Sequence, residues 1–293
     1  MFELILTQEK WKYISQLKRH KIDFLCVGTI VKVQGIRHLI RQTLISTKHL
    51  SLFKRPTIAS TMLNFIHKQN KLEAHNMNKT ELVFILDRSG SMSGLESDTI
   101  GGFNAMLEKQ QAEPGKCRIT TVLFDHAYEV LHDRIDIKAV NKLTAKEYFV
   151  RGTTALLDAV GNAINKIDNA QKNTAEDHRA EKVLFVITTD GMENASREFS
   201  YDKIKSMIER QKAKHNWEFI FLGANIDAVE VAGRFGIARE RAQTFHNDSK
   251  GISLNYDVLS DAVCSFRAAP ACASIPDDWS TEIDADYKRR KKK

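Results

Sequence analysis

Three oxygen-bearing side chains follow one another at a spacing of two, directly after a run of apolar residues. The apolar run is Leu82 to Leu86, and the polar residues are Asp87, Ser89 and Ser91. Five consecutive apolar residues predict a strand that is buried on both faces, because a half-exposed strand alternates apolar with polar residues. Side chains two residues apart on an extended chain project to the same side, so these three can converge on one point.

The triplet supplies one carboxylate and two hydroxyls, and no cysteine or histidine stands among its residues. An all-oxygen ligand set of this kind favours a hard cation such as Mg²⁺ over zinc. Asp and Ser are also common in turns and helix caps. Taken alone, the triplet is therefore more typical of local structure than of a metal site.

Two later stretches strengthen the metal interpretation. Residues 182–190 form a second apolar run that ends in a carboxylate, Asp190, and is followed by Gly191. Between the two runs, Thr153 stands just before a predicted helix. The apolar residues of that helix fall on one face: Leu156, Leu157, Val160, Ile164 and Ile167.

In sequence order, the motifs Asp-x-Ser-x-Ser, Gly-Thr and Thr-Asp-Gly make this chain resemble the von Willebrand factor A (VWA) domain. In that family the three motifs build the metal-ion-dependent adhesion site (MIDAS). The resemblance implies that Ser89, Ser91 and Thr153 are hydroxyl ligands of a Mg²⁺ or Mn²⁺ ion. It also implies that Asp87 and Asp190 are the two carboxylates of the site, which in the family often act through bound water.

The resemblance covers about residues 80–267 and leaves two points open. Thr154 stands beside Thr153, so either threonine can supply the third hydroxyl. Arg151 stands where many family members have a second glycine, which places a cation near the rim of the site. Single-domain members of this kind occur in bacteria and phages, and we expect this chain to be of that type.

Apolar runs of strand length alternate with amphipathic stretches of helix length along the middle of the chain. This alternation predicts a doubly wound, Rossmann-like α/β fold with a mostly parallel central sheet and helices on both faces. A turn at residues 125–126 predicts that residues 128–131 return as one antiparallel edge strand. Such folds bind ligands at the carboxyl ends of strands where strand order reverses, and Asp87 and Asp190 both stand at predicted strand ends.

Charge is distributed unevenly along the 293 residues. Residues 1–76 carry 13 Lys/Arg and 4 Asp/Glu, residues 77–287 carry 25 and 33, and residues 288–293 are all basic. The acidic middle argues against nucleic acid as the main ligand, although the terminal basic run has the composition of a nucleic-acid-binding tail.

Composition and periodicity predict three parts: a basic N-terminal extension (1–76), a VWA-like domain (77–269) and a mobile tail (270–293). The first strand signal begins just after Met77, so we expect the native protein to start there. The alternative is a short helical extension before the domain. No apolar stretch in the extension is long enough to span a bilayer.

Four cysteines are scattered through the chain without a regular spacing. This pattern indicates a reducing, cytoplasmic compartment and neither a disulfide framework nor a zinc site.

We therefore expect a non-enzymatic, divalent-cation-dependent module that captures a Glu or Asp carboxylate of a partner protein. The alternative is a metal-assisted hydrolase or phosphatase at the same site, which needs a positioned base or nucleophile. The sequence contains no Gly-x-Ser-x-Gly elbow and no Walker loop. His126 and Asp227 could approach the site, but a solvated turn and a helix N-terminus account for them as well. The identity of the partner and the oligomeric state are not specified by the sequence.

Overall fold

The computed structural model describes residues 79–271 and 273–291. By its internal contacts the chain divides after residue 65, and every described residue belongs to the second unit. The N-terminal extension predicted for residues 1–76, with its expected boundary at Met77, lies outside the described residues.

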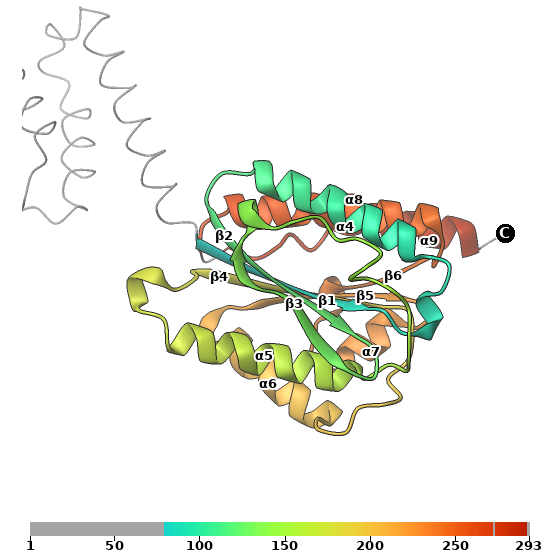
Figure 1. Ribbon diagram of the computed structural model, residues 1–293, viewed down its shortest axis with the longest axis horizontal. Helices are drawn as coiled ribbons and strands as arrows, with labels where there is room; N and C mark the ends of the chain where they lie inside the picture. Colours follow the sequence, from blue (N-terminus) through green and yellow to red (C-terminus); the bar gives the residue numbers. More distant parts are fainter. Residues whose placement is uncertain (1–78, 272, 292–293) are drawn as a thin grey trace, which may run out of the picture. The chain divides into compact units, whose positions relative to one another are not determined.

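Six strands form one sheet. They are β1 (Lys79–Asp87), β2 (Lys116–Phe124), β3 (Tyr128–Asp136), β4 (Lys182–Thr189), β5 (Glu218–Ala224) and β6 (Ala242–Phe245). Their order is β3-β2-β1-β4-β5-β6 (Figure 1). All neighbours are parallel except β2 and β3, which form an antiparallel hairpin at one edge. The predicted fold class is confirmed, and the edge strand expected at residues 128–131 continues to Asp136.

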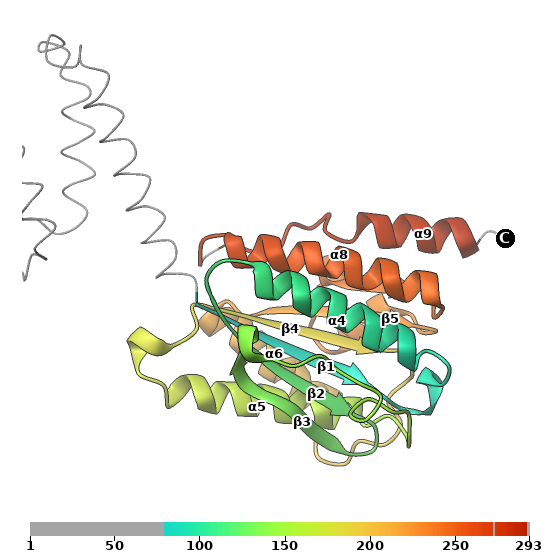
Figure 2. The ribbon, with the colours of Figure 1, turned by 45° about the horizontal axis from the view of Figure 1, so that its top comes forward.

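Helices cover both faces of the sheet. They are α4 (Glu96–Ala112), α5 (Leu156–Lys172), α6 (Tyr201–His215), α7 (Ala228–Arg234), α8 (Ser249–Ala268) and α9 (Thr281–Lys291). Helices α4, α8 and α9 lie on one side, and α5, α6 and α7 lie on the other (Figures 1 and 2). No helix in residues 79–271 or 273–291 is long and apolar enough to cross a membrane.

Strand β1 separates two hydrophobic cores. Leu82, Phe84 and Leu86 belong to the core under α4 and α8, and Val83 and Ile85 belong to the core under α5, α6 and α7. All five side chains are at most 1% exposed. Successive side chains of a strand point to opposite faces, so a strand with helices on both sides must be apolar at every position. This is the physical reason for the continuous apolar run in the sequence.

The order of the strands reverses between β1 and β4. From β1 the chain passes through α4 to β2, and from β3 it returns through α5 on the opposite face to β4. The connections on the two sides of this pair therefore leave in opposite directions, which opens a crevice at the carboxyl ends of β1 and β4. Asp87 is the last residue of β1, and Asp190 follows β4 directly.

The C-terminal segment is more ordered than the sequence indicated. We expected an irregular tail from residue 270, whereas residues 281–291 form α9, which lies beside α8 (Figure 2). Acidic residues in its first turn and four basic residues in its last turn complement the helix dipole. Ile283 is its one buried residue, and this single apolar anchor explains why the sequence showed no amphipathic period.

Two adjacent glycines of α4 have different surroundings. A Cβ atom on Gly102 would lie 2.3 Å from the ring of Tyr256 in α8, whereas a Cβ on Gly101 would meet nothing within 4 Å. The missing side chain at Gly102 therefore allows α8 to pack closely on α4.

We predict that Gly102→Ala lowers the free energy of unfolding by about 1–3 kcal/mol, because the methyl group forces the Tyr256 ring away from α4. Gly101→Ala is the matched control and should raise it by about 0.5–1 kcal/mol, because alanine is the better helix former. Urea unfolding of both variants measures the difference, and equal effects of the two substitutions would contradict this packing.

Candidate metal centre

The two predicted carboxylates lie at the ends of neighbouring strands. Asp87 and Asp190 are 2% and 3% exposed. The hydroxyl of Thr189, the last residue of β4, donates a 2.6 Å hydrogen bond to Asp87 Oδ2. This bond joins the carboxyl ends of β1 and β4, as expected for a site at the point where strand order reverses.

The serine loop, residues 89–93, brings both predicted hydroxyls to these carboxylates. Asp87 Oδ1 accepts a 2.7 Å hydrogen bond from the backbone N–H of Ser89, which turns the chain back over the strand end. The hydroxyl oxygens of Ser89 and Ser91 are 3.2 Å apart. The Ser91 hydroxyl also donates to Asp190 Oδ1. The structure thus gathers Asp87, Ser89, Ser91 and Asp190 from two segments about 100 residues apart.

The two candidate threonines differ in position. Thr153 is exposed, whereas Thr154 is 3% exposed. The Thr154 and Ser91 hydroxyl oxygens both lie 3.2 Å from the place that a Cβ atom would take on Gly191. A side chain on that residue would crowd both hydroxyls, so glycine keeps the centre of the cluster open. The buried threonine whose hydroxyl faces Gly191, as the Ser91 hydroxyl does, is Thr154, whereas the motif indicated Thr153.

The loop after β4 fixes Thr154 and the start of α5. The backbone N–H of Thr154 donates to Asn194 Oδ1 at 2.9 Å, and the N–H of Asn194 donates to the Thr154 carbonyl at 3.0 Å. The residue before α5, Ala155, has no side chain that can cap the helix. Glu193 caps it from the neighbouring loop instead, accepting a 2.8 Å hydrogen bond from Leu157 N–H.

A buried arginine, Arg88, directly precedes the serine loop and anchors it through an ion pair. Arg88 is fully buried, and its Nε donates a 2.8 Å hydrogen bond to Asp125 Oδ2. Arg151 donates to the same carboxylate oxygen at 2.8 Å, and its backbone N–H donates to the Arg88 carbonyl at 2.9 Å. Burial raises the pKa of Asp125, but hydrogen bonds from Arg151, the Ala127 N–H and Arg88 outweigh it and hold the pKa below its usual range.

This ion-pair group, which links the serine loop to the segment before Thr154, was not predicted from the sequence. Its only visible signals were a charged residue inside the serine motif and an aspartate at the end of an apolar strand.

The two other residues considered from the sequence have local roles. His126 Nδ1 lies 3.0 Å from Asp125 Oδ1, and its side chain is 58% exposed. Asp227 accepts a 3.0 Å hydrogen bond from the Glu230 N–H and caps α7. The helix-terminus interpretation of Asp227 accounts for its contacts.

The donor set fits a hard divalent cation. Burial raises the pKa of Asp87 to about 6, with a further contribution from the charge of Asp190. Burial likewise raises the pKa of Asp190. No group of three or more His, Cys, Asp or Glu that could hold a metal occurs in the described part of the chain. A cation at this place would therefore rely on the neighbouring hydroxyls, as Mg²⁺ and Mn²⁺ do more readily than zinc.

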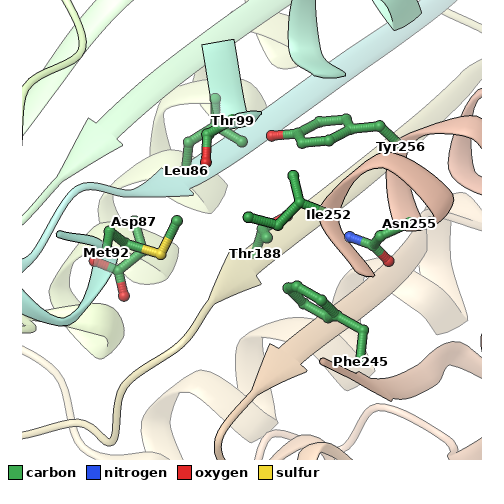
Figure 3. A pocket seen from close by; sticks show the side chains of 9 residues that line it. All are labelled: Leu86, Asp87, Met92, Thr99, Thr188, Phe245, Ile252, Asn255 and Tyr256. Carbon is green, nitrogen blue, oxygen red and sulfur yellow. The ribbon is translucent and has the colours of Figure 1, made fainter. Parts of the chain in front are cut away.

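A small cavity lies behind Asp87, between β1, β4 and the helices α4 and α8 (Figure 3). The space open to the centre of a water molecule is about 10 Å³, which is room for one water. Three lining atoms, Thr99 Oγ1, Asn255 Oδ1 and Tyr256 Oη, are buried without a hydrogen-bond partner among residues 79–271 and 273–291. The Tyr256 hydroxyl points toward Thr99 (Figure 3). The cavity suits a water molecule and is too small for an organic substrate.

Burial of the Asp87 carboxylate predicts a pH-dependent stability. The folded protein binds the Asp87 proton more tightly than the unfolded chain does, so this group makes the metal-free fold less stable as pH rises from about 4 to about 6. Above pH 6 we expect a cost of up to about 3 kcal/mol. In EDTA, Asp87→Asn should therefore be more stable than the wild type at pH 7, and the difference should shrink toward pH 4.

Urea unfolding between pH 4.5 and 8 measures this difference. Asp125→Asn is the control, because its pKa is shifted in the opposite direction and its neutralisation should destabilise the protein at pH 7. If metal-free Asp87→Asn were less stable than the wild type at pH 7, the ionised Asp87 carboxylate would not be destabilising the metal-free fold, and the prediction would be wrong.

Comparison with known proteins places the fold in a family. A family model described as the von Willebrand factor type A domain matches residues 81–254. No relative matches among the curated proteins.

Similar solved structures include a mussel byssus matrix protein with a zinc-occupied MIDAS motif (12% identity, 64% of this chain and 46% of that chain, TM-score 0.45). They also include the ArnB paralog VWA2 from Sulfolobus acidocaldarius (19% identity, 63% of this chain and 45% of that chain, TM-score 0.41). A third is the manganese-loaded TRAP protein of Plasmodium vivax (20% identity, 50% of this chain and 57% of that chain, TM-score 0.39). This chain spans less than half of the length of the first two.

The family match covers more than half of the 293 residues, and it begins within β1 and ends within α8. The chain therefore belongs to the von Willebrand factor type A domain family.

Proposed function

We propose that this chain is a divalent-cation-dependent protein-binding module with a MIDAS-type site. In the proposal, Ser89, Ser91 and Thr154 hold Mg²⁺ or Mn²⁺ directly, with Thr154 in place of the Thr153 that the motif indicated. Asp87 and Asp190 balance the charge, in part through bound water. The observation that carries the proposal is the Ser91 hydroxyl, which lies between the Ser89 hydroxyl and the Asp190 carboxylate.

Each protein group has a separate part in this arrangement. The two buried carboxylates supply negative charge that water cannot screen well. The hydroxyls supply neutral oxygens, so a bound cation would keep part of its charge for a carboxylate of a partner. Without a cation, the same carboxylates would repel an acidic partner. Capture of the partner is therefore expected to depend on the metal.

The contacts around the cluster favour binding over hydrolysis. A hydrolase needs a base or nucleophile that is free to act beside the metal. The imidazole of His126 is 3.0 Å from the Asp125 carboxylate and lies beside Gly152, and no hydrogen bond joins it to the Ser89 or Ser91 hydroxyl in the described part of the chain. The Ser91 hydroxyl donates to Asp190, and in the proposal both groups are committed to the cation. Both observations support a module that binds without turnover.

In this proposal the module comprises residues 77–269, as the sequence indicates, and acts in the cytoplasm. The location is supported by Cys117 and Cys264, which are both free thiols in the described part of the chain.

We predict that the full chain binds Mg²⁺ and Mn²⁺, and that Asp87→Ala, Asp190→Ala and Thr154→Val each weaken the affinity at least about tenfold, because each removes a charge or an oxygen ligand. Isothermal titration calorimetry measures the affinities. Thr153→Val is the matched control and should bind as the wild type does.

An affinity lost in Thr153→Val and kept in Thr154→Val would restore the assignment made from the sequence. Metal-dependent turnover of p-nitrophenyl phosphate by the wild type would favour the hydrolase instead.

A further inference from the structure

Large apolar side chains are rarely exposed in the described part of this chain. Those that are exposed are Ile135 (36%), Phe149 (43%) and Met192 (65%). Ile135 pairs with the first half of β2, at the end of the sheet away from the carboxylates. Phe149 and Met192 belong to the two loops that border the candidate metal centre. We call these two side chains the apolar rim.

Phe149 is held beside the serine loop. The segment that follows it is hydrogen-bonded to that loop and to the residue before the loop: Gly90 N–H donates to the Gly152 carbonyl at 3.1 Å, and Arg151 N–H donates to the Arg88 carbonyl at 2.9 Å. The guanidinium groups of Arg88 and Arg151 lie 5.5 Å and 5.3 Å from the centre of the Phe149 ring. These cation–π contacts fix the ring, so little conformational entropy is lost when a partner covers it.

Arg151 does not present a free positive charge next to Phe149. Its Nε is 2.8 Å from the Asp125 carboxylate, and its Nη2 is 3.7 Å from the Glu129 carboxylate. The cation that the sequence placed at the rim is therefore balanced within the protein. What this side of the metal centre offers to a partner is an aromatic ring.

Met192 lies in the loop that follows β4. It stands two residues after Asp190, next to the glycine that faces the Ser91 and Thr154 hydroxyls. Its side chain is the most exposed large apolar group among the described residues. A flexible thioether can adapt to differently shaped apolar partners.

We infer that the partner segment carries apolar side chains next to its acidic residue and that Phe149 and Met192 bind them. This inference rests on the proposed function, since the carboxylate of the segment is held at the metal. A segment that offered only charge would leave both apolar side chains in water. Charge and apolar contact together fit a short peptide motif with one Glu or Asp flanked by residues such as Phe, Leu or Met.

The test uses synthetic eight-residue peptides with one central Glu in a Gly/Ser background. One set has Phe, Leu or Met beside the Glu, and the other has Ser there. We expect the full wild-type chain in Mg²⁺ to bind the apolar set about tenfold more tightly, and EDTA to abolish binding of both sets. Phe149→Ser and Met192→Ser should each reduce this preference to less than about threefold.

Ile135→Ser is the matched control, because it removes an exposed apolar side chain of strand β3, away from the metal centre. This variant should keep the full preference for the apolar peptides. Calorimetry with Mg²⁺ alone is run on every variant. A Phe149→Ser protein that has lost Mg²⁺ affinity would show that the ring supports the serine loop, which would overturn its assignment to the partner.

Equal binding of the two peptide sets by the wild type would overturn the inference and leave the proposed function standing. Mg²⁺ binding without metal-dependent binding of any peptide would refute the proposed function, and the inference with it.

Discussion

Two buried carboxylates at the ends of adjacent parallel strands are the constraint on which the rest of this structure depends. Asp87 and Asp190 are almost fully removed from water, and burial raises the pKa of each. Buried negative charge is costly unless hydrogen bonds or a cation compensate it. Thr189 and the Ser89 N–H donate to Asp87, and Ser91 and Asn247 donate to Asp190. The two apolar cores on either side of β1 hold the strands that keep these groups together.

The hydroxyls around this pair are positioned by contacts that are not themselves part of the metal centre. The Arg88–Asp125–Arg151 ion pairs hold the serine loop, and Glu193 and Asn194 hold the start of α5. A buried ion pair fixes geometry because breaking it would leave an uncompensated charge. The loops can therefore carry polar, exposed side chains such as Ser91 and still present them in one arrangement.

The sheet was predictable from the sequence because burial on two faces imposes a continuous apolar run on a strand. The places of Asp87, Ser89, Ser91 and Asp190 at one edge of the sheet were predictable because these residues directly follow predicted strands. The sequence did not distinguish Thr153 from Thr154, since they are adjacent; in the structure Thr154 is buried, faces Gly191 and is bonded to Asn194, whereas Thr153 is exposed. Arg88 and Asp125 were missed because an ion pair between residues 37 positions apart leaves no periodic signal. Helix α9 was missed because a single buried residue, Ile283, anchors it.

The location of a bound cation tests this account most directly. Crystals of the full chain soaked in Mn²⁺ would show the ion by its anomalous scattering. We predict one peak in contact with the Ser89, Ser91 and Thr154 hydroxyls, beside Asp87 and Asp190. A peak that contacts Thr153 in place of Thr154, or a fully folded protein with no peak between the two carboxylates at saturating Mn²⁺, would contradict it.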